Sequence, residues 1–444
     1  MTTRTAVVLG ASIAGLLAAR ALSLHFSRVV ILERDTFTPE TLGREGTPQD
    51  VHPHVLLRRG LREIQVLCPG FRERLIAGGA VSSNAGDEWY ALFPQGLLAR
   101  HHSDTDILCA SRGLMERALR DEVCELPNVR LRTGMCVVDV ELDSEGPPAV
   151  TLQPVGGSGR AVLVADLCVD ATGRHSELER WLEASGFGPV PRSEIRPFLV
   201  YATRRYRGVR LPEGYRAVLS MPRAPDQPCG GMVMPIEGGE HIVTLLGFSQ
   251  KSPPEDEVGF ESFARRLRSP LVSHVLRTAQ AVSSIQVFRQ REYVFRHYDQ
   301  LGTWPQGLVA IGDGVCSLNP LYSQGMTSAA LAAWALERVA RRGQGSEDWA
   351  RSAQQAINAV YVAPWEMASR EDSRWPGTEG ARTGLRDRTL LRYLDRINRA
   401  ATRDPAVADA YLDALHMCRS PASLLAPRLL AKAWLHGGAP AGRA

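Results

Sequence analysis

The N-terminal part of the chain alternates between short apolar runs and one helical stretch. Thr5–Leu9 is a β-branched, apolar run with the length of a buried parallel strand. Leu16–Leu22 has the composition of a helix that packs on such a sheet, and Val29–Leu32 reads as a second strand. This order predicts a β-α-β unit with a parallel sheet. We therefore interpret Ala6–Leu22 as part of a folded unit and not as a signal peptide.

The turn between the first strand and the helix has the residue types that a dinucleotide requires. Gly10 permits a tight turn, the small Ser12 lets backbone N–H groups approach a pyrophosphate, and Gly15 lets the helix pack closely on the strand. The N-terminus of the helix then faces the phosphates. The residues of this turn that we expect to contact the cofactor are Gly10, Ser12, Ile13, Ala14 and Gly15.

An acidic residue closes the second strand. Glu33 lies 23 residues after Gly10, where it can accept hydrogen bonds from the ribose hydroxyls of a dinucleotide. We include the adjacent Arg34 among the expected cofactor contacts. Strand, glycine-rich turn, helix, strand and acid in this order favour a dinucleotide site over a ligand-free helix start.

A second pattern lies near the other end of the chain. Leu308–Ile311 predicts a buried strand, and it is followed by a Gly-Asp turn, an Asn-Pro loop and a helix from about Gln324. An aspartate at the end of a central strand can accept hydrogen bonds from a polyol, and a helix N-terminus offers free N–H groups to negative charge. A flavin needs both, because its ribityl chain must be held and its reduced ring is anionic.

This segment resembles the Gly-Asp motif of the para-hydroxybenzoate-hydroxylase-like FAD monooxygenases. The resemblance implies FAD as the cofactor, with Asp313 as the ligand of the ribityl hydroxyls and the following loop along the isoalloxazine ring. The positions that match the motif and the loop are Gly312, Asp313, Pro320, Gly325 and Met326.

Other stretches fit the same family. Arg112, which opens a helix, matches the position that the family uses against the FAD ribose and phosphate, although a solvated arginine is an alternative. Val137 lies in a strand pair whose backbone would meet the adenine. Asp170–Gly173 departs from the family's Asp-Gly motif, which serves both FAD and NAD(P)H. Reduction directly by NAD(P)H and reduction through a partner flavin reductase therefore both stay open.

The segment Gly46–Gly60 resembles a loop and helix of bacterial natural-product oxygenases, including polyene epoxidases and relatives of squalene epoxidase. In that family the turn approaches the isoalloxazine edge, which makes His54 a candidate flavin neighbour. The alternative is that His52 and His54 only bond loop carbonyls. We expect no metal site, because no third ligand lies near the His-x-His pair.

The expected fold is α/β (α+β): a Rossmann-like FAD-binding domain, an inserted β-sheet substrate domain and a C-terminal helical region. Residues 1–185 would form the FAD-binding domain, with a minor substrate-domain segment around 75–105. A β-rich substrate domain would follow at 186–300, a second FAD-binding segment at 301–345 and the helical region at 346–444. Runs such as Arg196–Arg207, Gly230–Pro235 and His241–Gly247 supply the strand signals of the inserted domain.

Composition narrows the class of protein. The net charge of +4 and the absence of a Lys/Arg cluster argue against a nucleic-acid partner. The eight scattered cysteines form no Cys-x-x-Cys pair, which is typical of reduced thiols in a cytoplasmic protein. Gly314–Leu336 is uncharged but contains Asn, Pro, Gln and Gly, so we expect no integral membrane segment.

The resemblance implies an FAD-dependent monooxygenase that reduces O2 and, through a flavin C4a-hydroperoxide, inserts one oxygen into a hydrophobic small molecule, in keeping with a natural product. Hydroxylation and epoxidation use the same intermediate, and we assign no catalytic residue. An FAD-dependent reductase or dehydrogenase of the prenyl-reductase type is the main alternative, and a non-catalytic FAD-binding scaffold is another. A flavin halogenase needs a lysine between flavin and substrate, but the two lysines, Lys251 and Lys432, both lie outside the N-terminal half.

Overall fold

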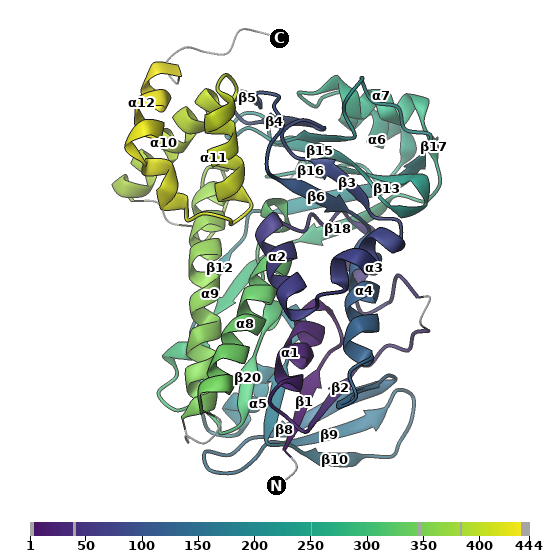
Figure 1. The fold of residues 1–444 in the computed structure, drawn as a ribbon, viewed down its shortest axis with the longest axis vertical. Coiled ribbons are helices and arrows are strands. Elements are labelled where there is room, and N and C mark those ends of the chain that lie inside the picture. The colour runs from purple at the N-terminus through teal and green to yellow at the C-terminus, as the bar shows by residue number, and fades with distance from the viewer. Residues whose placement is uncertain (1–3, 39–40, 250, 344–347, 382–383, 437–444) are drawn as a thin grey trace.

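This computed structural model describes residues 4–38, 41–249, 251–343, 348–381 and 384–436. The N-terminal strand is the central strand of a five-stranded parallel sheet. The strand order is β20-β11-β1-β2-β7. The bounds are β1 (Thr5–Leu9), β2 (Arg28–Leu32), β7 (Val129–Arg132), β11 (Leu167–Asp170) and β20 (Leu308–Ala310). Every pairing is parallel, so the carboxyl ends of all five strands meet at one edge of the sheet (Figure 1).

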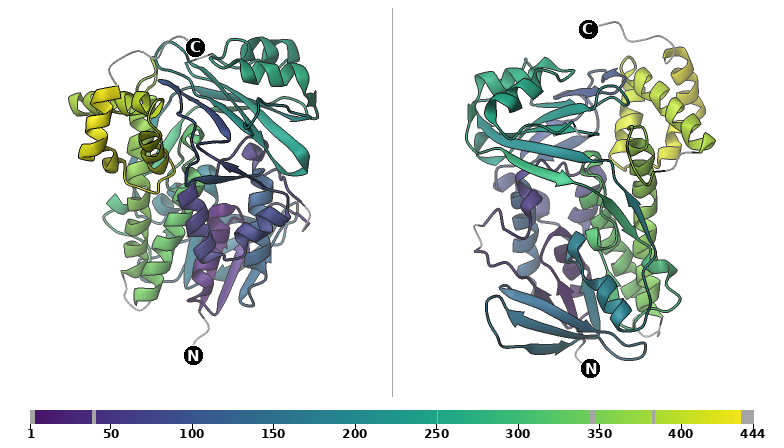
Figure 2. Two further views of the ribbon diagram at one scale, coloured as in Figure 1. Left: turned by 45° about the horizontal axis from the view of Figure 1, so that its top comes forward. Right: turned by 180° about the vertical axis from the view of Figure 1, so that it is seen from behind.

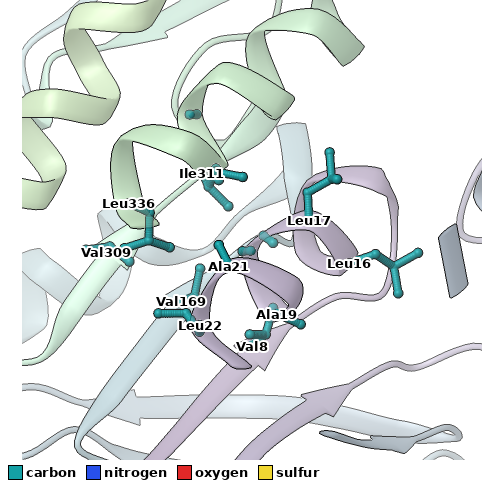
Figure 3. Close-up of a cluster of buried hydrophobic side chains, with 14 of the residues drawn as sticks. Val8, Leu16, Leu17, Ala19, Ala21, Leu22, Val169, Val309, Ile311 and Leu336 are labelled. Carbon is teal, nitrogen blue, oxygen red and sulfur yellow. The ribbon is translucent and has the colours of Figure 1, made fainter. Parts of the chain in front are cut away.

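Helices cover this sheet, and their apolar side chains form a hydrophobic core with those of the strands. The helices of this part are α1 (Ile13–Ser23), α2 (Arg58–Leu67), α3 (Phe71–Ala77), α4 (Arg112–Cys124), α5 (Leu178–Ala184), α8 (Gly325–Gly343) and α9 (Trp349–Asp372). Figure 3 shows Ala21 of α1 next to Leu336 of α8, which in turn lies next to Val309 of β20. The predicted strands and helix agree with β1, β2, β20 and α8 to within a residue or two.

A small antiparallel sheet lies at the N-terminal end of the molecule (Figure 2). It contains β8 (Met135–Glu141), β9 (Ala149–Pro154) and β10 (Ala161–Val164) in the order β10-β9-β8. The backbone N–H of Met135 donates to the carbonyl of Glu33 (2.9 Å), which joins β8 to the end of β2.

An eight-stranded sheet forms the opposite end. It contains β4 (Trp89–Phe93), β5 (Gly96–Leu97), β13 (Leu199–Arg207), β14 (Ala217–Ser220), β15 (Cys229–Pro235), β16 (Glu240–Gly247), β17 (Gln280–Ala281) and β18 (Gln286–Gln290). The helices α6 (Glu257–Ala264) and α7 (Pro270–Thr278) cover its outer face. The strand predicted at Arg196–Arg207 is β13. It begins later than Arg196, because Pro197 has no N–H and Phe198 adopts φ 52°.

Two strand pairs link these parts, and three helices end the described chain. The pairs are β3 (Val81–Asn84) with β6 (Asp106–Cys109) and β12 (Arg192–Ile195) with β19 (Tyr293–Arg296). The helices are α10 (Leu385–Ala401), α11 (Pro405–Leu415) and α12 (Pro427–His436), which Figure 2 shows beside the eight-stranded sheet. Their apolar side chains, such as Ile397 and Leu412, share a core with Trp89 and Phe93 of β4.

These elements confirm the predicted fold class: a Rossmann-like parallel sheet, a β-sheet inserted between its strands, and a helical C-terminal part. Across the described ranges, no helix is both long and apolar enough to cross a membrane.

Candidate active site

The first turn of the parallel sheet leaves no room for larger residues. Gly10 has φ +100°, and a Cβ there would lie 2.7 Å from the carbonyl oxygen of Ala171. A Cβ at Gly15 would lie 2.0 Å from the carbonyl oxygen of Gly10. The glycines therefore let β1, α1 and β11 approach each other at the carboxyl edge of the sheet, where α/β folds bind ligands.

The N-terminus of α1 is built to receive an anion. The hydroxyl of Ser12 forms no cap on α1 but instead accepts a hydrogen bond from Nη2 of Arg112 (2.6 Å). The first N–H groups of the helix, at Ile13 and Ala14, thus keep no side-chain cap. Arg112 is only 7% exposed, and its Nη1 has no hydrogen-bond partner among the described residues. A buried, partnerless guanidinium nitrogen beside a helix N-terminus fits the pyrophosphate of a dinucleotide.

Glu33 sits in a buried ionic cluster. Its carboxylate accepts hydrogen bonds from the N–H groups of Ala11 (2.8 Å) and Asp35 (3.0 Å). Nη1 of Arg44 lies 3.0 Å from Oε2 of Glu33 and 3.0 Å from Oδ2 of Asp35, and its Nε lies 2.7 Å from Oε1 of Glu116. Burial lowers the pKa of Arg44, but Glu116 and the other two carboxylates outweigh burial and raise it. Arg44 is therefore a permanent buried cation.

Sequence reasoning missed Arg44 and Glu116. Arg44 lies in a loop without periodicity, and Glu116 is one of several charged residues of α4. Arg34, which follows Glu33 and was an expected cofactor contact, points into solvent: its side chain is 64% exposed, and its Nε lies 3.8 Å from Oδ1 of Asp35. Val137 lies on β8 next to a register shift, on the strand that bonds to Glu33 through Met135.

The second motif meets the first in space. Gly312 has φ +72°, and a Cβ there would lie 2.7 Å from Cβ of Ala14 in α1. The turn that contains Asp313 therefore lies against the start of α1. The side chain of Asp313 is 44% exposed, with Nη2 of Arg174 4.0 Å away. A half-exposed carboxylate at this edge is available to hydroxyl groups of a ligand.

The loop after β20 leads into α8. Asn319 caps the turn Pro320–Tyr322 by accepting a hydrogen bond from the N–H of Leu321 (2.9 Å), and Ser323 takes the left-handed conformation with φ 55°. The helix starts at Gly325 and Met326. Here Gln324 Oε1, Thr327 Oγ1 and Ser328 Oγ are buried, and none has a hydrogen-bond partner among the described residues. Orphaned polar atoms at a helix N-terminus fit a polar ring edge such as that of a flavin.

The two histidines have different partners. Nδ1 of His54 lies 2.9 Å from the carbonyl oxygen of His52, so His54 bonds a loop carbonyl, as one of the two alternatives expected. Burial, reinforced by the positive charge of Arg112, lowers the pKa of His54 to about 3. His52 instead bonds Thr203 of β13 through Nδ1 (2.6 Å), and burial lowers its pKa to about 4. Both rings are therefore neutral at physiological pH.

No group of metal ligands forms around the histidines: within the described ranges, no three His, Cys, Asp or Glu side chains cluster as a metal site would require. His52 instead faces rings of the eight-stranded sheet, with centroids 5.6 Å from Phe288 and 6.3 Å from Tyr201.

Asp170 ends β11 in the segment that departs from the family pattern. It is fully buried, and its carboxylate accepts hydrogen bonds from the N–H of Thr172 (3.0 Å) and from the hydroxyls of Thr172 and Ser176. These bonds occupy the acceptor oxygens within the protein. Asp170 therefore supports the turn beneath Gly314, whose Cβ would lie 3.4 Å from its Oδ2.

An apolar cluster joins the loop of Leu321 to the eight-stranded sheet. Its buried members are Leu199, Tyr201, Leu246, Phe248 and Trp375, with Ala224, Phe288 and Leu321 packed against them. The rings of Phe248 and Trp375 stack with centroids 4.6 Å apart at 11°. Aromatic and aliphatic side chains therefore pack between this loop and the sheet.

A buried carboxylate that the sequence did not reveal holds the same loop. Asp372 ends α9 and is 1% exposed. It accepts hydrogen bonds from Nδ2 of Asn319 (2.8 and 3.0 Å) and from the hydroxyl of Tyr322 (2.9 Å). Burial raises its pKa to about 7. No periodicity marks an aspartate at the end of a long helix, so only the packing of α9 on the loop reveals this contact.

Fold and site together define the class of protein: a dinucleotide-binding protein built on a Rossmann-like sheet. A family model described as "FAD binding domain" matches residues 2–363. The chain belongs to this FAD-binding family. Its predicted similarity to the para-hydroxybenzoate-hydroxylase-like FAD monooxygenases is confirmed at the level of the family, and so is FAD as its cofactor.

Individual relatives agree. The chain is 30% identical over 443 residues to Protein Rv3254 of Mycobacterium tuberculosis, and the match covers 94% of this chain and 91% of that protein. Among solved structures, a flavoprotein/dehydrogenase from Cytophaga hutchinsonii has a TM-score of 0.67 at 16% identity, covering 98% of each chain. PqsL, a probable FAD-dependent monooxygenase from Pseudomonas aeruginosa, has a TM-score of 0.63 at 17% identity, covering 83% of this chain and 96% of that one. At these identities the two structures establish the shared fold.

Proposed function

We propose that the protein inserts one oxygen atom from O2 into a hydrophobic small molecule, by hydroxylation or epoxidation. The observation that carries the proposal is the apolar cluster around Leu321, Phe248 and Trp375, which lies against the loop expected to face the flavin ring. Bound FAD supplies the redox chemistry, passing electrons from a donor to O2. A substrate bound beside this cluster would contact apolar side chains, which would favour an apolar compound such as a natural product.

The residues of the chain bind and orient. The N–H groups at Ile13 and Ala14, with Nη1 of Arg112, are suited to the pyrophosphate. The half-exposed Asp313 is suited to the ribityl hydroxyls. The N-terminus of α8, at Gly325, favours negative charge on the reduced ring, while the apolar cluster keeps water away from it.

Reduction can reach the flavin from NAD(P)H directly or through a separate flavin reductase. Asp170 stands where the family carries its Asp-Gly motif, in a segment that departs from that motif, and its oxygens are bonded to Thr172 and Ser176. This engagement supports delivery by a reductase. Stopped-flow reduction by NADH, by NADPH and by a reductase with NADH compares these routes.

A reductase or dehydrogenase of the prenyl-reductase type is the second candidate, and the departure at Asp170–Gly173 favours it. A halogenase is disfavoured: Lys432 pairs with Asp404 in the C-terminal helices (2.7 Å), and Lys251 lies exposed after β16.

Labelled oxygen tests the proposal. The FAD-loaded protein is incubated with a reductant, ¹⁸O2 and a panel of apolar polyenes and aromatic compounds, and the products are analysed by mass spectrometry. We expect a product that gains one labelled oxygen atom, and no product under nitrogen. Turnover that proceeds without O2, or oxygen that comes from water, would assign the protein to the reductase class.

A further inference from the structure

The C-terminal helices carry the positive charge of the molecule. Residues 385–436 contain nine Lys and Arg, five Asp and no Glu, a net charge of +4 that equals the net charge of the whole chain. Each of the five aspartates already has a partner within 4 Å: four pair with an arginine or a lysine, and Asp409 pairs with the ring of His101. The pairs are Asp387 with Arg370, Asp395 with Arg374, Asp404 with Lys432, Asp409 with His101, and Asp413 with Arg419.

Several arginines of the same region, in contrast, face no carboxylate. Among the described residues, no ion pair forms at Arg386, Arg388, Arg392, Arg396 or Arg428. Four of them are exposed, and the fifth, Arg396, lies over the ring of Trp434 at 4.1 Å. The surface of α10 and α12 is therefore cationic.

Large apolar side chains are exposed on these same helices. Leu385 is 82% exposed, Trp434 69%, Leu435 78% and Leu425 47%. Leu385 and Leu425, together with Leu390 and Tyr393, line an open groove of about 550 Å³ with Arg386 and Thr389 at its margin. Exposed leucine and tryptophan side chains at such density are unusual for a surface that faces only water.

The cationic and apolar groups share one face. Leu385, Thr389, Arg392 and Arg396 follow each other at three- and four-residue steps, so they lie along one side of α10. Leu425 borders this side through the groove, and Trp434 contacts it through Arg396. Figure 1 shows α10 and α12 at the outer margin of the molecule, far from the three-stranded sheet.

We propose that this face of α10 and α12 docks on an acidic phospholipid surface. Guanidinium groups bind headgroup phosphates, and a tryptophan with neighbouring leucines enters the interface between headgroups and acyl chains. The mixture of arginines with exposed Leu385, Leu425 and Trp434 on this face matches both layers of such a surface. An acidic protein partner is the other class of molecule that could meet these groups, and failure of the protein to bind acidic vesicles would favour it.

The docking face is connected to the loop expected to face the flavin. Asp387 and Asp395 of α10 bond Arg370 (2.9 Å) and Arg374 (3.2 Å) at the end of α9. Between these arginines lies Asp372, which holds the loop. A membrane-bound orientation would bring this side of the apolar cluster near the lipid phase, from which an apolar substrate partitions.

The test uses the FAD-loaded full chain and vesicles of phosphatidylcholine, with or without phosphatidylglycerol as the acidic lipid. Co-sedimentation gives the partition coefficient of the wild type, of the triple variant Arg388→Gln/Arg392→Gln/Arg396→Gln, and of a control triple, Arg130→Gln/Arg132→Gln/Arg160→Gln, which removes three exposed arginines from the other end of the molecule. Each arginine near an acidic membrane adds about a fivefold factor in binding. We expect the first triple to lose about a hundredfold and the control to change little.

A second readout reports insertion of the apolar side chains. Brominated lipid in the acidic vesicles quenches tryptophan fluorescence, and we expect this quenching to fall in Trp434→Phe while flavin content stays constant. Equal partition into neutral and acidic vesicles, equal loss in both triple variants, or quenching that persists in Trp434→Phe would each overturn the proposal. Absence of any binding to acidic vesicles would overturn it as well.

Discussion

Asp372 gives the sharpest quantitative prediction. Its carboxylate is 1% exposed and accepts hydrogen bonds from Asn319 and Tyr322. Burial, with a smaller contribution from the charge of nearby Glu371, raises its pKa from 3.8 to about 7, against the effect of these two donors. The hydroxyls of Tyr201 and Tyr293 also face this region; burial holds their pKa values well above the usual range, so they stay neutral.

The sign of the effect on stability follows from this shift. Between pH 3.8 and about 7 the folded protein holds a proton on Asp372 that the unfolded chain has lost. The free energy of unfolding therefore decreases as pH rises through this range, by at most about 1.4 kcal/mol per pH unit. Over the full range from pH 3.8 to about 7, ionisation of Asp372 lowers the free energy of unfolding by an amount on the order of 4 kcal/mol.

The variant Asp372→Asn cannot ionise but keeps the size of the side chain. We expect the difference in unfolding free energy between the variant and the wild type to move in favour of the variant as pH rises from about 4 to about 7, and to stay constant above. Urea unfolding of the FAD-free protein at a series of pH values measures it, with the exposed Asp299→Asn as the matched control. A difference between Asp372→Asn and wild type that is the same at every pH would refute a titrating Asp372.

Three further predictions concern the cofactor cradle. Gly15→Ala places a Cβ 2.0 Å from a backbone oxygen, so thermal unfolding should show a loss of about 1–3 kcal/mol, whereas Gly302→Ala, with nothing within 4 Å, should be neutral. Arg112→Gln removes the partnerless guanidinium nitrogen, and calorimetry should show FAD binding weakened about 10- to 100-fold; unchanged affinity would reject its role at the pyrophosphate. Asp313→Ala should also weaken flavin binding about 10- to 100-fold and so lose flavin during desalting, while Asp299→Ala keeps it. Equal flavin-to-protein absorbance ratios in the two variants would reject the ribityl assignment.

Local sequence determined the framework of the site. The strand-to-helix turn and the end of the second strand could be located from Gly10, Gly15 and Glu33, and the second turn from Gly312 and Asp313. In each case a neighbouring stretch of backbone requires that residue type. Strands such as Thr5–Leu9 follow from short apolar runs whose side chains must be buried on both faces of a parallel sheet. For the same reason the fold class was predictable.

Only the tertiary structure decided which distant side chains meet. Gly312 lies against Ala14, Arg44 pairs with Glu116, and Asp372 reaches the loop of Asn319, although the two partners in each case lie far apart in the chain. Neither periodicity nor local propensity encodes such contacts, because they depend on how α4, α8 and α9 pack around the sheet. The charge state of each group is likewise set by packing: burial moves the pKa of Asp372 up and that of His54 down, whereas the same residue types in a solvated loop would keep their ordinary values.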